Sequence, residues 1–229
     1  MAIKLQSTKG FGQSGVKMLV YGQAGAGKTT LIKTLPDPVI ISAESGLMSL
    51  SESDIPYVTV STLDDLREVM AWIMSSAEAQ SFRSIALDSI SEIADVVLAE
   101  EKTASKDGRA AYGTMGDKMR KVIRAFRDLP DRNVYFSAKI DRAQDEQGMM
   151  LYGPYMPGKT LMQDVPFFFD EVMALRIVRD KDGASRRALM CQSDGLWTAK
   201  DRSGRLSAWE EADLGAIISK INGGERGEK

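Results

Sequence analysis

Short runs of apolar, often β-branched residues occur through the first two thirds of the chain, and each has the length of a buried strand. Parallel strands are covered by helices on both faces, so they are apolar throughout and do not alternate with polar residues. The runs predict strands at residues 16–21, 39–42, 57–60, 84–88 and 134–138. The pattern therefore indicates a mostly parallel sheet.

Amphipathic segments lie between these runs. Apolar side chains recur every three or four residues, which places them on one face of a helix. Thr62 and Asp65 precede one such segment with the spacing of a capping box. A shorter helix before residue 39 must end near Leu35, because Pro36 and Pro38 cannot continue it. The longer helices are predicted at residues 63–73, 90–98 and 115–129.

The last third of the chain has a different pattern. Residues 171–179 and 186–191 flank the turn signal at 180–183 and predict an antiparallel hairpin, and residues 196–199 predict a further strand. Strands that alternate with helices and are then followed by an edge hairpin indicate an α/β fold with a mostly parallel central sheet.

Two stretches lack periodicity, and the termini are polar. Residues 102–112 and 139–163 are therefore expected to be loops, and long loops of this kind are often functional. We expect one compact domain over residues 16–221, with an N-terminal lead-in at residues 1–15 and a flexible tail at residues 222–229.

Composition narrows the chemistry. The formal charge of −2 favours neither nucleic acid nor membrane overall, so any DNA contact must be a local patch. One cysteine and no histidine exclude an internal disulfide and a histidine base. The N-terminus lacks a signal-like apolar segment, and no apolar run reaches the length of a membrane span. A cytoplasmic protein that does not enter the membrane is expected.

The strongest motif is G-x-x-x-x-G-K-T, directly after the first predicted strand. It indicates a phosphate-binding loop, in which glycines let backbone N–H groups surround phosphate oxygens. Lys28 would reach the β and γ phosphates, and the Thr29 hydroxyl would bind Mg²⁺. The predicted nucleotide-binding residues of this loop are Gly22, Gln23, Ala24, Gly25, Ala26, Gly27, Lys28, Thr29 and Thr30.

Three other strand ends carry polar side chains. Asp88 ends an apolar strand as a Walker B aspartate does, where it can help to hold Mg²⁺. Glu44 follows the strand after the phosphate loop, where a carboxylate could polarise the attacking water. Ser137 and Lys139 end the strand after Asp88 and are candidate sensors of the γ phosphate. Ordinary solvated strand ends remain the alternative for Glu44, Ser137 and Lys139.

Taken in order, the segments GQAGAGKTT, VIISAE, IALDS and NVYFSAK resemble the core of RecA-like ATPases. The segment LYGPYMPGK at residues 151–159, followed by FDEV at 169–172, resembles phage nucleotide-binding proteins that act as single-strand annealing proteins. The resemblance covers about residues 16–205. It implies an ATPase that binds ATP and Mg²⁺, uses Glu44 as the catalytic carboxylate and acts on single-stranded DNA in phage recombination.

The same resemblance implies location and partners. A phage-encoded protein would work in the cytoplasm of a bacterial host, and a single-stranded-DNA-binding protein is left open as a further partner. The chain lacks the flanking domains of full RecA proteins and has a very short first helix, which disfavours strand exchange more than ATP binding.

Residues 199–204 are similar to the K-x-R motif of ring-forming RecA relatives, in which the cations reach the neighbouring subunit's γ phosphate. The similarity implies that Lys200 and Arg202 act across an interface and that the active unit is a homo-oligomer, either a ring or a filament. A basic surface turn is the alternative.

A local basic patch is the candidate DNA site. Residues 102–121 contain six cationic side chains against two carboxylates. In the RecA arrangement this stretch, together with the one after Lys139, faces the DNA strand, and tyrosines at 112, 152 and 155 could stack on bases. The predicted DNA-binding residues are Lys102, Lys106, Arg109, Tyr112, Lys118, Arg120 and Lys121.

Other functional classes remain. A regulatory GTPase is disfavoured because residues 138–141 lack the asparagine of N-K-x-D and residues 88–91 lack the switch glycine. A small-molecule kinase would need an arginine-bearing lid, yet residues 139–163 contain only Arg142. A nucleotide-switched loading or structural partner with little hydrolysis is the alternative that is not an enzyme.

Overall fold

The structure is a computed structural model that describes residues 15–44, 46–179 and 182–223. Its strands are β1 (Lys17–Gly22), β2 (Pro38–Ser42), β3 (Tyr57–Thr59), β4 (Ser84–Asp88), β5 (Asn133–Gln144), β6 (Met150–Pro154), β7 (Glu171–Arg179), β8 (Ser185–Met190), β9 (Lys200–Asp201) and β10 (Trp209–Glu211). Across the described residues they form one sheet in the order β10-β8-β7-β1-β5-β4-β2-β3, with β6 paired to β5 and β9 paired to β7.

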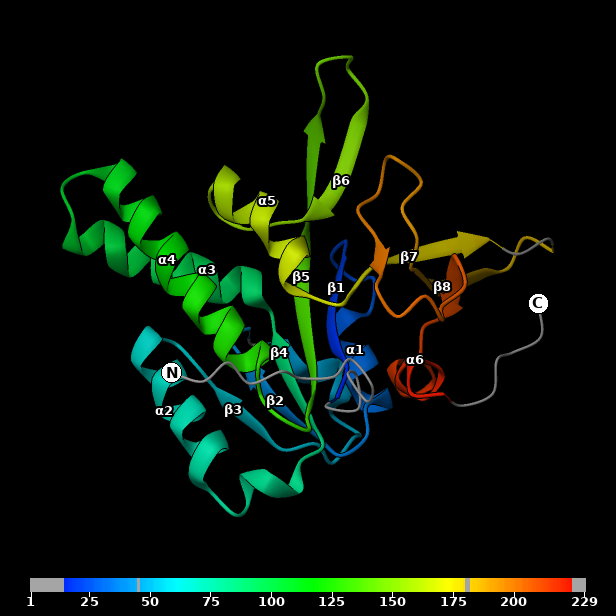
Figure 1. The fold of residues 1–229 in the computed structure, drawn as a ribbon, viewed down its shortest axis with the longest axis horizontal. Coiled ribbons are helices and arrows are strands. Elements are labelled where there is room, and N and C mark those ends of the chain that lie inside the picture. Colours follow the sequence, from blue (N-terminus) through cyan, green and yellow to red (C-terminus); the bar gives the residue numbers. More distant parts are fainter. Residues whose placement is uncertain (1–14, 45, 180–181, 224–229) are drawn as a thin grey trace, which may run out of the picture.

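The six strands from β7 to β3 in this order run parallel, while β8, β10, β6 and β9 are antiparallel to their neighbours. The predicted α/β fold with a mostly parallel sheet and an antiparallel edge hairpin is therefore confirmed. Helices cover the sheet on both faces (Figure 1). They are α1 (Lys28–Leu31), α2 (Leu63–Ser75), α3 (Ile90–Ala104), α4 (Gly108–Arg127), α5 (Lys159–Phe168) and α6 (Leu214–Ile221).

Two apolar clusters lie on opposite faces of the sheet. Neighbouring residues of β1 divide between them: Leu19 belongs to the cluster with α2, α3, α4 and α5, while Met18 and Val20 belong to the cluster with α1 and α6. Successive side chains of a strand point to opposite faces, so a strand buried on both faces must be apolar at every position. This is why the sheet strands were recognisable as continuous apolar runs.

Local signals explain several element ends. The Thr62 hydroxyl accepts a hydrogen bond from the Asp65 amide, and the Asp65 carboxylate accepts one from the Thr62 amide, which confirms the capping box that begins α2. The short first helix is also confirmed, because α1 continues only as a 3₁₀ turn (Ile32–Thr34) before the prolines.

Both stretches predicted as loops are largely regular, so those predictions were wrong. The helix α3 continues to Ala104 and α4 begins at Gly108, which leaves a short turn instead of a loop at residues 102–112. Within residues 139–163, β5 extends to Gln144 and pairs with β6, and α5 begins at Lys159. The extension of β5 is polar and partly exposed, so it lacks the apolar pattern on which strand prediction depends.

The C-terminal third agrees with prediction in part. The predicted hairpin is present as β7 and β8. The strand predicted at residues 196–199 instead begins at Lys200, and Trp197 forms an isolated bridge with Tyr152. Neither β10 nor α6 was predicted, although Asp213 caps α6 by accepting a hydrogen bond from the Ala216 amide.

The predicted limits of the domain stay a prediction. Nearly all of the lead-in at residues 1–15 and most of the tail at residues 222–229 lie outside the described residues. Among the helices in the described part of the chain, none combines the length and apolar character needed to cross a bilayer.

Candidate nucleotide site

The phosphate loop joins β1 to α1 at the carboxyl edge of the sheet. Gly27 adopts a φ of 101°, in the left-handed region that favours glycine, directly before the first residue of α1. A Cβ atom at Gly22 would lie 2.8 Å from the Leu175 carbonyl oxygen of β7. The loop therefore needs glycine at both ends, once for its backbone conformation and once for close approach to β7.

Lys28 lies folded over this loop. Its Nζ donates hydrogen bonds to the carbonyl oxygens of Gly22 and Gln23, at 3.0 and 3.1 Å. Burial lowers the pKa of Lys28, while the carboxylates of Glu44 and Asp88 raise it in part. An ammonium held between a phosphate loop and two carboxylates is placed to neutralise the charge of a bound polyphosphate.

The side chains of Thr29 and Asp88 are in contact, as expected for two residues that would hold one Mg²⁺ ion. The Thr29 hydroxyl donates to Asp88 Oδ2 at 2.6 Å, and the Ser137 hydroxyl donates to Asp88 Oδ1. Strand β5 lies between β1 and β4, so Ser137 is the natural neighbour of both strand ends. Hydroxyl and carboxylate oxygens are the ligands that Mg²⁺ prefers, and protein sites usually add only one or two carboxylates to the substrate phosphates. Thr29 and Asp88 therefore fit this ion.

Ser137 is fully buried, and its hydroxyl is engaged with Asp88. The geometry supports a role in orienting the Asp88 carboxylate, while direct contact with a γ phosphate stays a prediction. Lys139, the other candidate sensor, forms ion pairs with Glu92 at 2.5 Å and Asp95 at 3.3 Å. Partial burial opposes the charge of Lys139, but these two carboxylates outweigh it and raise the lysine pKa.

Glu44 lies next to Asp88 because their strands are paired. Ser42 of β2 is opposite Asp88 of β4, and Glu44 follows two residues later. The Ser89 hydroxyl donates to Glu44 Oε1 at 2.6 Å. A carboxylate held by a neighbouring hydroxyl at the edge of a phosphate site can orient a water molecule for attack on a phosphoryl group.

Tyr135 supports the loop and was not predicted. Its ring is fully buried in β5, and its hydroxyl donates to the Lys28 carbonyl oxygen at 2.8 Å. Buried tyrosine hydroxyls usually find a hydrogen-bond partner, so Tyr135 was recognisable as a residue in need of one. The identity of that partner depends on the packing of α1 against β5, which local sequence does not show.

Lys200 and Arg202 lie apart from the phosphate loop of their own subunit. Strand β9 pairs with the first residues of β7, which in turn pair with Met18 and Leu19 of β1. Four residues of strand, about 13 Å, separate Met18 from the end of β1. Lys200 donates to the Pro166 carbonyl oxygen at 2.8 Å, and Arg202 forms an ion pair with Asp170 at 2.7 Å. The sheet thus brings together Lys28, Thr29, Glu44, Asp88 and Ser137, but not these two cations.

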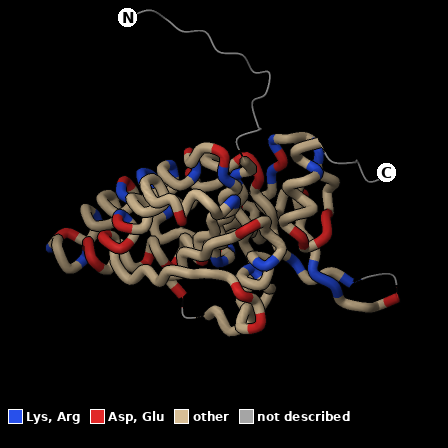
Figure 2. Tube along the Cα trace, turned by 90° about the horizontal axis from the view of Figure 1, so that it is seen from below, with Lys and Arg blue, Asp and Glu red and all other residues tan. Residues whose placement is uncertain are grey.

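Two members of the predicted DNA patch have structural partners. Lys118 pairs with Glu101 of α3, and Arg120 pairs with Asp164 of α5 at 2.8 Å and with Asp117 at 3.1 Å. These contacts tie α4 to both neighbouring helices, so much of their charge is neutralised within the subunit. Figure 2 shows Lys and Arg interspersed with Asp and Glu along this part of the molecule.

The remaining members of the patch lie on the surface. Lys106, Arg109 and Lys121 are exposed, the first two around the turn that joins α3 to α4. The ammonium of Lys102 lies 5.1 Å from the centre of the Tyr112 ring, which is itself exposed. Binding of DNA by these residues stays a prediction.

A stack of aromatic rings around Arg176 was not predicted. The rings of Tyr152 and Trp197 stack with centroids 4.3 Å apart, and the Arg176 guanidinium carbon lies 4.3 Å from the Trp197 centroid and 5.2 Å from that of Trp209. Tyr21, near the end of β1, lies 6.3 Å from Trp197. One face of Tyr152, proposed above to stack on a base, is therefore occupied by Trp197. These rings come from segments that are distant in the sequence, so no periodic pattern of residues predicts their contacts.

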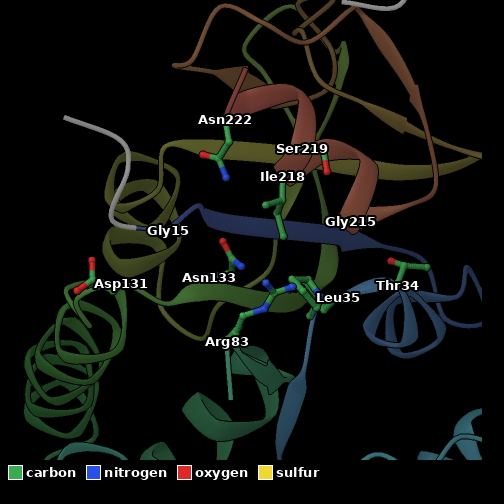
Figure 3. Close-up of a pocket in the computed structure, with 11 residues that line it drawn as sticks. Gly15, Thr34, Leu35, Arg83, Asp131, Asn133, Gly215, Ile218, Ser219 and Asn222 are labelled. Atoms are coloured by element: carbon green, nitrogen blue, oxygen red, sulfur yellow. The ribbon is translucent and has the colours of Figure 1, made fainter. Parts of the chain in front are cut away.

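A cavity of about 680 Å³ lies at the opposite edge of the sheet. Asn133 and Arg83 border it at the amino ends of β5 and β4, and Ile218 and Asn222 border it from α6 and the residue after it (Figure 3). None of the candidate site residues lines it. The cavity is therefore separate from the phosphate loop.

The sequence matches a protein family, and the fold is similar to that of a solved structure. A family model described as an AAA domain matches residues 14–203. Among solved structures, a KaiC-like protein from the hyperthermophilic archaeon Pyrococcus horikoshii OT3 matches with a TM-score of 0.41 and 14% sequence identity, over 77% of this chain and 78% of that one. No curated protein matches the sequence.

Proposed function

The chain belongs to the AAA domain family of P-loop nucleoside triphosphatases, and we propose that it is a Mg²⁺-dependent ATPase that acts on single-stranded DNA. Its work would be strand annealing in phage recombination, carried out by a homo-oligomer with ATP bound at the subunit interfaces. The observation that carries the ATPase reaction is the convergence of Lys28, Thr29, Asp88 and Glu44 at one edge of the sheet.

Each of these residues has a defined role in hydrolysis. Thr29 and Asp88 would hold Mg²⁺, which supplies positive charge at the β and γ phosphates. Lys28 adds a second positive charge, and the loop amides bind the phosphate oxygens. Glu44 orients a water molecule and accepts its proton as the water oxygen bonds to the γ phosphorus. The bond between the γ phosphorus and its bridging oxygen breaks, and ADP and phosphate are released.

Single-stranded DNA is proposed as the partner on three grounds. The sequence resembles phage annealing proteins over residues 151–172. The exposed cations Lys106 and Arg109 lie at the α3–α4 turn, and the exposed Tyr112 ring lies beside Lys102 in the same region. This turn and the β5–β6 hairpin both project on the side of the carboxyl ends of the parallel strands (Figure 1). A strand bound there would lie on the same side of the sheet as the nucleotide, which would allow the two sites to communicate.

The test is nucleotide turnover by the purified protein with and without single-stranded DNA, together with DNA affinity over a range of salt concentrations. We expect DNA to raise turnover and salt to weaken binding, because phosphate contacts release counterions. Neutralising Lys106, Arg109 and Lys121 together should reduce the slope of log affinity against log salt by roughly two, at about 0.7 per lost contact.

A charge-matched control removes Lys33, Arg67 and Arg205, which are exposed and lie outside α3 and α4. The control should retain the slope of the unmodified protein. An equal decrease of this slope in both triple variants would mean that DNA binding depends only on net charge. That result would contradict a DNA site at the α3–α4 turn. Turnover raised by a soluble phosphoryl acceptor and indifferent to DNA would instead identify a small-molecule kinase.

A further inference from the structure

The β7–β8 hairpin packs one of its faces against the phosphate-loop segment. Leu189 of β8 and Leu175 of β7 are directly opposite each other and share a buried cluster with Ala26 and Leu31. Side chains of a strand return to the same face every second residue. Arg187 is two residues before Leu189, so it lies on the face turned toward the phosphate loop.

Arg187 reaches the loop itself. A Cβ atom placed on Gly27 would lie 2.9 Å from Arg187 Nε, 3.0 Å from its Cζ and 3.2 Å from its Cδ. The guanidinium therefore covers the residue directly before Lys28. The amides at this point, the start of α1, are the ones that a phosphate loop directs at its anion.

The positive charge of Arg187 does not stabilise the fold through an ion pair within the described residues. The side chain is exposed, and no carboxylate in the described part of the chain forms an ion pair with it. Arg176 of β7 differs from Arg187 because its guanidinium has aromatic partners. It is stacked against Trp197 and Trp209 on the opposite face of the hairpin. Figure 2 shows basic residues gathered toward the free end of this hairpin.

We propose that Arg187 binds the phosphates of the nucleotide held by the phosphate loop of its own subunit. It would form a second cationic contact beside Lys28, from the edge hairpin instead of the loop. A guanidinium offers several N–H donors in a plane, which suits the oxygens of a phosphate group. The proposal rests on the proposed function only for nucleotide binding, and it does not depend on DNA or on the oligomer.

The test is isothermal titration of the Arg187→Ala variant with two probes, Mg²⁺–ADP and inorganic tripolyphosphate. Loss of a charge-assisted contact should weaken both by roughly ten- to a hundredfold. Arg187→Lys should recover part of the affinity, because it restores the charge without the planar donor set. The Arg186→Ala variant is the matched control, since it removes the same charge one residue away on the other face of β8.

Unchanged affinity for both probes in Arg187→Ala would overturn the proposal. Weaker binding of ADP with unchanged binding of tripolyphosphate would also overturn it, because the contact would then be to the base or sugar. Thermal unfolding of each variant checks that the exposed substitutions leave the fold intact. Failure of DNA to stimulate turnover would contradict the proposed function but leave these titrations interpretable, so the two failures are distinguishable.

Discussion

The Lys28 side chain is partly buried and lies near two carboxylates. We derive a direct prediction from this position. Replacing it with alanine leaves the fold in place, because its side-chain hydrogen bonds go to loop carbonyls that can bind water instead. Loss of its charge at the phosphates should reduce ATP turnover by about a hundredfold or more. Steady-state phosphate release measures this, with Lys33→Ala on the exposed surface of the same segment as the control. Normal turnover in a folded Lys28→Ala protein would contradict the site.

Glu44 tests the chemical step separately from binding. Glu44→Gln should still bind ATP, but turnover should fall by roughly 10²- to 10⁴-fold, because an amide is a far weaker base than a carboxylate. Ser89→Ala should have a smaller effect on turnover in the same direction, since the Ser89 hydroxyl holds the Glu44 carboxylate and does not itself act as a base. Nucleotide titration measures ATP binding, and single-turnover hydrolysis measures the rate of the chemical step. Hydrolysis at the normal rate in Glu44→Gln would assign the base to another residue.

At the scale of elements, the carboxyl groups of Glu171 and Asp201 support the turn that carries Arg202. Glu171 at the start of β7 is buried, and burial together with the neighbouring Asp201 carboxylate raises its pKa to about 8. Burial also opposes ionisation of Asp201, but hydrogen bonds from Ser203, Leu206 and Gly204 outweigh it and lower the Asp201 pKa. Glu171 therefore retains its proton at neutral pH, while Asp201 is ionised.

This pair gives stability a defined pH dependence. The folded state holds the Glu171 proton up to about pH 8, while the unfolded chain releases it near its ordinary pKa of 4.5. The burial of Glu171 therefore costs no stability below pH 4.5, and the free energy of unfolding falls as pH rises from there to about 8. Glu171→Gln mimics the protonated form, so it should flatten this fall and be more stable than the unmodified protein above pH 8.

Denaturant unfolding at several pH values measures the effect, and Glu52→Gln on the surface is the control. A Glu171→Gln protein whose stability falls with pH as steeply as that of the unmodified protein would contradict the raised pKa of Glu171. Asp201 also accepts hydrogen bonds from the turn that contains Arg202. Glu171→Gln should therefore also make ATP turnover less dependent on pH between 7 and 9.

At the scale of the whole molecule, β9 lies too far along the sheet for Lys200 and Arg202 to reach their own phosphate loop. If they act on a neighbour's nucleotide, two inactive proteins can form an active site together. A Lys28→Ala subunit retains its Arg202, and an Arg202→Ala subunit retains Lys28 and Glu44. Mixing them should restore up to about a quarter of normal ATP turnover per site, because an intact pair forms in one of four random arrangements.

Native mass measurement of the mixture confirms that subunits exchange. Mixed oligomers that form but stay inactive, with each variant folded, would show that Arg202 does not act across an interface. Its ion pair with Asp170 would then be its main role, and Asp170→Asn should destabilise the protein to the same extent as Arg202→Ala.

The predictable parts of this protein depend on local pattern or on the rule that parallel strands end at one edge of the sheet. Continuous apolar runs marked β1, β2, β4 and the start of β5 because both faces of those strands are buried. The phosphate loop was evident from spacing. Glu44, Asp88 and Ser137 followed because each lies near the point where the parallel pairing of a neighbouring strand ends.

Tertiary structure decided the contacts between segments that are distant in sequence. Whether a cation is free or paired depends on which helix faces it, so Lys118 and Arg120 could not be distinguished from Lys121 by composition. The approach of Arg187 to Gly27, the Tyr135 hydrogen bond and the pairing of Glu171 with Asp201 all arise from strand order and register. Register is set by the packing of the complete sheet, and no single segment of the sequence contains that information.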